Sequence, residues 1–448
     1  MYDRREFRQK LWHLVLPIAF QQLMLSAVSA ADAIMLGFIS QDSLSAISLA
    51  GQIQFIFNLF LAAMTIGLSI FAAQYYGKKD MKAVNQFFGM ILHYTEVVAI
   101  LFCVAALCIP RELMKLFTKD ANLITMGARY LQIIAVTYLL IGVSQVYLCI
   151  LKNTGHTLKS TVISCVSVVV NILLNAVFIF GLCGAPALGI AGAAIATVIS
   201  RVIECIWVVI DSYSKGRSRP KLKYILHSDS IYRKDFWKHT SPVLANEIAW
   251  GGGFTMFSVI MGHLGTDAVA ANSIANIVKN LLVCFAGGLG AGGGIMVGNE
   301  LGAGQLKKAR CYGDRLCKLS VIAGLLTGGA LLLLTPCILH FTKLSQTAQE
   351  YLSWMLCICC FNIIGKSVNG TTIGGIFCAG GDSKFGFLCD TITLWVVILP
   401  LGALAAFGWN LAVPVVYLIL NLDEVIKLPA VFRHYKKYRW IKDLTRES

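Results

Sequence analysis

Twelve apolar runs of about 20 residues, scarcely interrupted by charge, constrain this chain more than any other feature of its sequence. A helix of about 20 residues spans the roughly 30 Å hydrocarbon core of a bilayer. Lipid admits only helices and closed barrels, and barrel strands alternate apolar with polar residues, which these runs do not. We therefore predict an all-α, multi-pass membrane protein whose twelve spans are about 11–36, 53–75, 86–109, 129–151, 160–182, 188–210, 238–262, 272–298, 316–339, 351–374, 386–407 and 410–431.

The composition agrees with a lipid environment. Hydrophobic residues make up 57% of the 448 residues and charged residues only 14%, whereas a soluble domain carries about 25% charged residues. The net charge of +15 raises the question of a nucleic-acid partner. The basic residues follow the membrane topology instead, so we expect membrane lipid and small molecules as partners, and no nucleic acid.

The Lys and Arg residues predict the orientation. With the N-terminus placed inside, about thirty of the 38 lie in the termini and the even connections, while the outward connections hold Arg111, Lys115, Lys119 and Lys343. Cytoplasmic loops carry such an excess of basic residues. The prediction is a multi-pass protein of a bacterial-type inner (plasma) membrane with both termini in the cytoplasm.

The chain consists of two similar halves. Pro17 and Gly77 are separated by 60 positions, as are Pro242 and Gly302, and a polar break at 211–237 divides the spans six and six. Six is an even number, so both halves begin on the same side and the repeat axis runs along the membrane normal. The predicted organisation is a six-helix lobe at 1–210, a cytoplasmic linker at 211–237, a second six-helix lobe at 238–431 and a basic cytoplasmic tail at 432–448.

Energy-converting and catalytic motifs are lacking. The glycine-rich eighth span lies within an apolar run and does not follow a strand, so it is not a phosphate-binding loop. The eight His residues are scattered, which disfavours an integral-membrane enzyme, and the repeat of lobes disfavours a channel. We expect no catalytic residue and no cofactor, with energy taken from an ion gradient or from the substrate.

Several short motifs follow one another in the same order as in a known family, and they accompany the repeat of the two halves. They are Pro17 with Asp32 and Gly37, Tyr130-Leu131, Gly189–Thr197, Gly298–Gly304 and Ala379–Ser383. The chain from Leu11 to Val431 thereby resembles the multidrug and toxic compound extrusion (MATE) family, although Cys378 stands where the family usually has Arg. The resemblance implies a monomeric antiporter that exports organic, often cationic compounds in exchange for H⁺ or Na⁺, with alternating access between lobes. Flippases for lipid-linked saccharides share this architecture and are the alternative.

A polar group in the first lobe is the candidate ion-coupling site. Asp32 lies deep in the first span, where a charge is a functional candidate. Asn171 and Asn175 are four residues apart and so share one helix face. Their amides either form hydrogen bonds between helices or join Asp32 as oxygen ligands of the coupling ion. The resemblance adds Tyr130, Gln145 and Thr197, and if Na⁺ is the coupling ion, its ligands would include Asp32, Asn171 and Asn175. Some relatives have Asp at the position of Asn175, and Gln145 replaces an Asn.

Three charged residues mark the second lobe. Glu247 follows Pro242 by five residues and either binds a cationic substrate or pairs with Lys279 or Lys366, both of which also lie within spans. A strongly cationic cleft would favour the flippase alternative, because lipid-linked saccharides are polyanions. Two other sets of charges lie within spans. Arg201 and Glu204 are predicted to form a structural ion pair, and the role of Glu96, one turn after His93, is left open.

Overall fold

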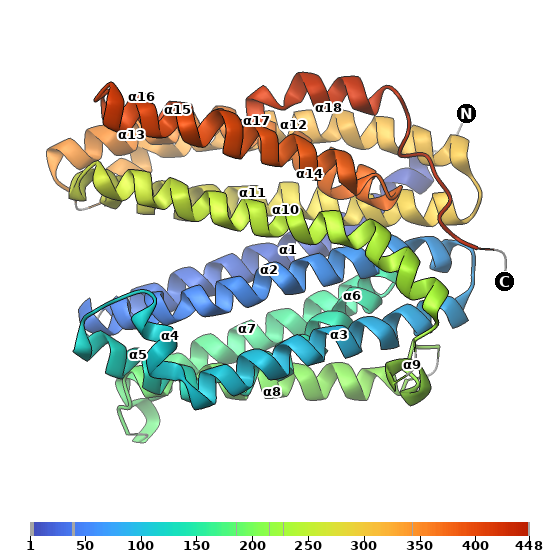
Figure 1. Cartoon of the computed structure of the whole chain (residues 1–448), viewed down its shortest axis with the longest axis horizontal. Coiled ribbons are helices and arrows are strands. Elements are labelled where there is room, and N and C mark those ends of the chain that lie inside the picture. The colour runs from blue at the N-terminus through green and yellow to red at the C-terminus, as the bar shows by residue number, and fades with distance from the viewer. Residues whose placement is uncertain are drawn as a thin grey trace. The chain divides into compact units, whose positions relative to one another are not determined.

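The computed structural model describes residues 4–37, 41–184, 186–214, 216–226, 228–342 and 344–446, so the predicted outward base Lys343 lies outside the described residues. Within these ranges the regular elements are all helices (Figure 1). By length and apolar composition ten of these helices are able to cross a membrane, or eleven if the bent pair α5 and α6 counts as one. The predicted all-α, polytopic class is confirmed, and the number of spans is close to the predicted twelve.

The chain forms two compact units. The N-terminal unit comprises Met24–Ala72 and Asp80–Trp237, and the C-terminal unit comprises Lys238–Ser448 together with Met1–Leu23 and Ala73–Lys79. In chain order the helices are α1 Arg4–Gly37, α2 Gln41–Gly77, α3 Met81–Cys108, α4 Pro110–Lys115, α5 Ala121–Ile134, α6 Thr137–Asn153, α7 Thr157–Phe180, the 3₁₀ turn η1 Leu182–Gly184, α8 Ile190–Ser212, α9 Leu222–Leu226, α10 Ser230–His263, α11 Thr266–Gly302, α12 Leu306–Phe341, α13 Gln346–Asn369, the π-helical η2 Gly370–Phe377, α14 Ser383–Thr391, the π-helical η3 Ile392–Ile398, α15 Leu399–Ala403, the π-helical η4 Leu404–Gly408, α16 Val413–Leu420, α17 Asp423–Ile426 and α18 Leu428–Tyr435.

The N-terminal unit packs around aromatic side chains of α2, α3 and α6. The ring of Phe57 lies 5.2 Å from that of Tyr138 and 5.3 Å from that of Phe102, within the range in which tilted aromatic pairs attract. The Asp80 carboxylate starts α3 by accepting the backbone N–H of Ala83 at 3.0 Å, as helix N-caps do. The predicted span 129–151 is in fact two helices, α5 and α6, which meet at 49°.

Glycines on α11 allow close helix packing in the C-terminal unit. A β-carbon at Gly290 would lie 2.7 Å from the carbonyl oxygen of Gly370 on η2. At Gly302 it would collide with the carbonyl of Gln74, and Gly77 has the same relation to Asn299. Only glycine permits such approach. The glycine-rich span is therefore a packing surface for η2 and for the end of α2.

A cluster of charges joins three helices in the same unit. The Glu300 carboxylate, on α11, is almost fully buried and accepts the ammonium of Lys10 at 2.6 Å and that of Lys308 at 3.3 Å. Glu6 on α1 contacts the same two lysines at 2.9 and 2.8 Å. Because the two acids and the two bases alternate, the cluster is neutral and fixes the start of α1 against α11 and α12.

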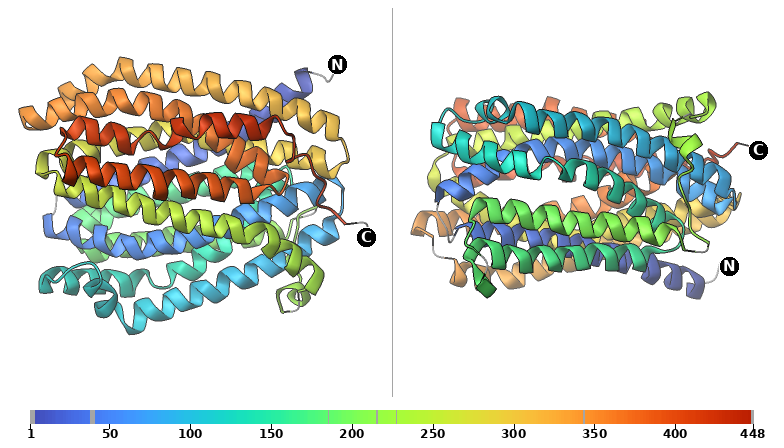
Figure 2. Two further views of the ribbon diagram at one scale, coloured as in Figure 1. Left: turned by 45° about the horizontal axis from the view of Figure 1, so that its top comes forward. Right: turned by 90° about the horizontal axis from the view of Figure 1, so that it is seen from below.

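The segment after α18 packs against the body of the C-terminal unit (Figure 2). Trp440 is 0% exposed, and its indole and carbonyl fill the spaces left by Gly313 and Gly380. The side chain of Gln74 donates to the carbonyl of Ala379 at 2.7 Å and accepts the backbone N–H of Leu444 at 2.7 Å. The basic tail predicted at 432–448 is therefore an integral part of this unit as far as Arg446.

Helix ends differ from the predicted boundaries in two places. The polar break at 211–237 is shorter, because α8 continues to Ser212 and α10 begins at Ser230, with the short α9 between them. The predicted last span, 410–431, is divided into α16, α17 and α18. The first division falls at Asn421 and Leu422, directly before the charged residues of α17, and the second falls at Lys427.

Candidate functional site

The predicted polar group of the N-terminal unit is assembled in the structure. Asn175 Nδ2 donates to Asp32 Oδ1 at 2.6 Å and lies 3.3 Å from Asn171 Oδ1. Asn171 Nδ2 in turn lies 3.4 Å from the hydroxyl oxygens of both Thr197 and Ser200. A continuous chain of hydrogen bonds thus runs from α1 across α7 to α8; we call these five residues the Asp32 cluster.

Local sequence explains why the cluster forms. Asn171 and Asn175 are one turn apart on α7, and Thr197 and Ser200 are three residues apart on α8, so each pair projects from one face. A β-carbon at Gly192 would collide with the carbonyl oxygen of Phe178. Glycine at this position lets α8 approach α7 closely enough for the hydroxyls to meet Asn171. Ser200 was not predicted, although its spacing from Thr197 is a signal that sequence reasoning could have used.

The cluster retains acceptor capacity. Asn175 is 1% exposed and Asn171 is 8% exposed, whereas Asp32 is only half-buried. Asn175 Oδ1 is buried and has no hydrogen-bond partner among the described residues. Buried polar atoms are nearly always paired, so this oxygen, next to a carboxylate, is suited to a proton-bearing group or a hard cation.

The other predicted members, Tyr130 and Gln145, are connected less directly to Asp32. Tyr130 on α5 is half-buried and within electrostatic range of Asp32. Gln145 on α6 is half-buried and makes no side-chain hydrogen bond with any described residue. The structure therefore does not connect Gln145 to the cluster.

Two other charged sites of this unit were also predicted. Arg201 Nη1 contacts Glu204 Oε2 at 2.6 Å, so the structural ion pair is confirmed. Glu96 has a buried carboxylate oxygen without a hydrogen-bond partner among the described residues. That oxygen faces Gly142 on α6, and no described hydrogen bond or ion pair joins it to His93.

In the C-terminal unit the three predicted charges remain apart. Lys279 Nζ lies 3.5 Å from Asn421 Oδ1, and Lys366 Nζ lies 6.0 Å from the ring centre of Trp250. Glu247 is half-buried and forms no ion pair with either lysine among the described residues. The pairing that the sequence left open for Glu247 is thus not made in this structure.

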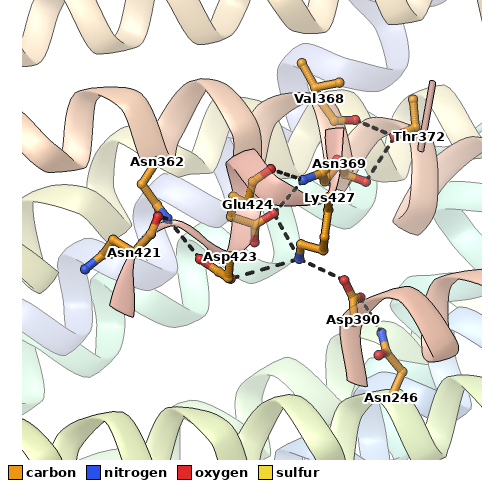
Figure 3. A network of polar contacts seen from close by, with 10 residues as sticks. All are labelled: Asn246, Asn362, Val368, Asn369, Thr372, Asp390, Asn421, Asp423, Glu424 and Lys427. Carbon is orange, nitrogen blue, oxygen red and sulfur yellow. Dashed lines mark hydrogen bonds and ion pairs between the residues drawn. The ribbon is translucent and has the colours of Figure 1, made fainter. Parts of the chain in front are cut away.

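A larger charged network in the same unit was missed by sequence reasoning (Figure 3). Lys427, 7% exposed, contacts Asp390 at 2.8 Å, Glu424 at 3.2 Å and Asp423 at 4.0 Å. Amide groups complete it: Asn246 donates to Asp390 at 3.1 Å, Asn369 to Glu424 at 2.8 Å and Asn362 to Asp423 at 3.3 Å. The i,i+3 and i,i+4 spacing of the last-span acids from Lys427 was the available signal.

Similarity to known proteins agrees with this architecture. A family model described as MatE matches residues 17–177 and 242–404, once in each half. The Bacillus subtilis protein named "Uncharacterized transporter YisQ" is 20% identical over 434 residues, covering 96% of this chain and 95% of that protein. The B. subtilis "Probable multidrug resistance protein NorM" is 23% identical over 434 residues, covering 91% and 92%.

A solved structure shares the fold. A MOP superfamily transporter from Pyrococcus furiosus superposes with a TM-score of 0.88 at 15% identity, covering 98% of this chain and 97% of the other. The family model extends over both halves and more than half of all residues. These findings indicate a membrane transporter of small molecules rather than an enzyme. The chain belongs to the MATE family of multidrug efflux transporters.

Proposed function

We propose that this protein is a secondary antiporter that exports amphipathic organic compounds, cations among them, in exchange for H⁺ or Na⁺. The observation that carries the proposal is the Asp32 cluster: a membrane carboxylate bonded to Asn175 at 2.6 Å beside an unpaired buried amide oxygen. A carboxylate inside a membrane helix is costly and marks ion pathways. The name of the NorM relative supports drugs as cargo.

The cluster offers a physical basis for coupling. Burial favours the neutral form of a carboxyl group, whereas amide donors favour the ionised form. A change in the packing of α1 against α7 shifts this balance at Asp32 and so loads or releases a proton. Oxygens of Asp32, Asn171 and Asn175 are equally suited to Na⁺, since hard cations bind carboxylate and carbonyl oxygen. Coupling requires that the ion bind the inward and outward states with different affinity.

Export assays test the function and identify the ion. Intact cells containing the protein are loaded with a cationic fluorescent dye, and export of the dye is followed with and without Na⁺ and with a protonophore. We expect export to stop on Na⁺ removal if Na⁺ is the coupling ion, or on protonophore addition if H⁺ is. Export that persists when both gradients are abolished would contradict the proposal.

The basic connections support a cytoplasmic location for both termini and for the segment between α8 and α10, in a bacterial inner membrane. In a cysteine-depleted protein, Ser214→Cys and Thr266→Cys place single thiols at exposed positions on the two predicted sides. An impermeant maleimide added to intact cells should label Thr266→Cys and reach Ser214→Cys only after permeabilisation. The reverse pattern would refute the orientation.

We further propose a functional monomer, because one chain carries both six-helix halves.

A further inference from the structure

Three helices of the C-terminal unit, α1, α11 and α12, enclose an apolar groove of about 170 Å³. We propose that this groove holds an acyl chain of an anionic phospholipid, whose headgroup is bound by Arg8, Arg315 and Lys318 at the end of the groove nearer the starts of α1 and α12. The site goes beyond the proposed export function, because its ligand is a lipid of the surrounding membrane and not an exported compound.

The groove has a buried floor and exposed walls. Val15 of α1, Leu289 of α11 and Ala323 of α12 line it and are buried. Trp12 and Leu326 also line it, from α1 and α12, and are exposed. The small side chain of Ala323 leaves space between the walls that a larger residue would fill. The groove is therefore a concave site on the surface of the unit, open to a ligand from the membrane.

The size and lining of the groove suit a hydrocarbon chain. All of its lining side chains are hydrophobic. An apolar cavity of about 150 Å³ binds benzene, so a groove of about 170 Å³ has room for a short stretch of hydrocarbon. Sites for drug-sized ligands occupy about 300–1,000 Å³ and contain polar groups that orient the ligand. A segment of an acyl chain fits this groove better than an exported compound does.

Three basic residues lie at one end of the groove. Arg8 on α1, and Arg315 and Lys318 on α12, each precede a lining residue by four positions and so share its helix face. The guanidinium of Arg315 lies 5.2 Å from the ring centre of Phe7, which brings α12 against the start of α1. Arg8 and Lys318 are exposed, and neither forms an ion pair with a residue that the structure describes. The bases of two helices thus face the same end of the groove.

The acids of the same region have other partners. Glu6 and Glu300 are neutralised by two lysines, and Asp314 accepts the hydroxyl of Tyr435 at 2.8 Å. The three bases therefore leave this end positive. In the proposed orientation it lies in the cytoplasmic leaflet, where basic pockets between helices bind anionic headgroups. Trp12 beside the bases agrees with a position at the membrane interface, where Trp is enriched.

Lipid binding to the purified full-length protein tests the headgroup site. Native mass spectrometry measures binding of dioleoylphosphatidylglycerol, which is anionic, and of dioleoylphosphatidylcholine, which is zwitterionic. The wild type should bind the anionic lipid more tightly. Arg8→Gln and Lys318→Gln should each weaken its binding about fivefold, the effect of one base near an anionic lipid, and leave the zwitterionic lipid unaffected. Lys82→Gln, at an exposed position on α3 of the other unit, should change neither.

A second set of variants tests the acyl-chain site without changing charge. Ala323→Phe fills the groove and should weaken both lipids. Its melting temperature without added lipid shows whether it folds. Leu326→Gln makes an exposed wall of the groove polar and should also weaken both lipids, so the test does not depend on Ala323→Phe folding. Leu325→Gln is its matched control, because Leu325 is an exposed neighbour on α12 outside the groove, and it should bind both lipids as the wild type does.

These measurements use neither an exported compound nor an ion gradient, so failure of the proposed export function leaves them unaffected. Selective loss of the anionic lipid in Arg8→Gln and Lys318→Gln, with loss of both lipids in Leu326→Gln, supports the site. Equal affinity of the wild type for the two lipids would overturn it, as would Leu326→Gln behaving like Leu325→Gln. A wild-type dimer that becomes a monomer in Leu326→Gln would assign the groove to a second copy of the chain and would overturn the inference too.

Discussion

Replacing Asp32 by Asn should reduce ion-driven export to background while leaving folding and substrate binding intact. In the unsubstituted protein Asn175 Nδ2 lies 2.6 Å from Asp32 Oδ1. The asparagine side chain keeps the shape of the aspartate and a polar contact with Asn175, but it removes the only carboxylate of the Asp32 cluster. Without it neither a proton nor a charge-compensated Na⁺ is held there, and a substrate without a coupled ion moves only down its own gradient. Transport in proteoliposomes with an imposed pH or Na⁺ gradient measures the loss, and dye binding measures what is retained.

Asp42→Asn is the matched control for this experiment. Asp42 is an exposed carboxylate at the start of α2 that accepts an amide from Asn122 at 3.1 Å, so the same chemical change is made in the same unit outside the cluster. We expect near wild-type export from this variant. Full gradient-driven export by Asp32→Asn would remove Asp32 from the coupling mechanism and direct attention to Glu96 and Glu247.

The second large effect is expected at Lys427. Replacing this lysine by Met leaves Asp390, Asp423 and Glu424 without the cation they share. Removing one partner of a buried ion pair destabilises a protein by about 3–5 kcal/mol, because the remaining charge is buried and unpaired. We expect a marked fall in the melting temperature of the purified protein, followed by tryptophan fluorescence in detergent, and a smaller yield of folded protein.

Lys366→Met provides the comparison for Lys427→Met. It removes a lysine from the same unit that has no carboxylate within ion-pair distance among the described residues, so its melting temperature should stay close to that of the wild type. Adding Asp390→Asn to Lys427→Met should restore part of the lost stability, since one of the unpaired charges is then removed. An unchanged melting temperature in Lys427→Met would show that the network does not stabilise the fold.

The sequence predicts much of the fold because membrane spans are recognisable locally. A continuous apolar run is enough to place α3, α7 and α11, and the repeat of halves follows from spacing alone. The break between α5 and α6 could not be foreseen: it falls at Ala135 and Val136, which carry no helix-breaking signal. The π-helical segments η2, η3 and η4 could not be predicted either, since a change of hydrogen-bond register has no simple signature in the amino-acid composition.

Of the two polar sites, the sequence predicts one and not the other. The Asp32 cluster is predictable because its polar residues stand out within apolar runs and share helix faces. The Lys427 network is not, because Asp390 lies 37 positions from Lys427 along the chain and the two meet only through the packing of α14 near α17. For Glu247, the sequence left open a pairing with Lys279 or Lys366, but the structure places Lys279 Nζ near Asn421 and Lys366 Nζ near the ring of Trp250.

The charges of α17 have a consequence for biogenesis. The apolar helix before them, α16, has only 8 residues, less than half the length that crosses a bilayer unaided. Each charged residue that follows carries an insertion penalty of about 2.5–3.5 kcal/mol at the centre of a helix. We therefore expect that hydrophobicity alone does not insert this segment into lipid. We expect its entry into the membrane to depend on its contacts with Asn369 and Asp390 on helices that precede it in the chain, so that insertion and tertiary folding of α16–α18 form a single event.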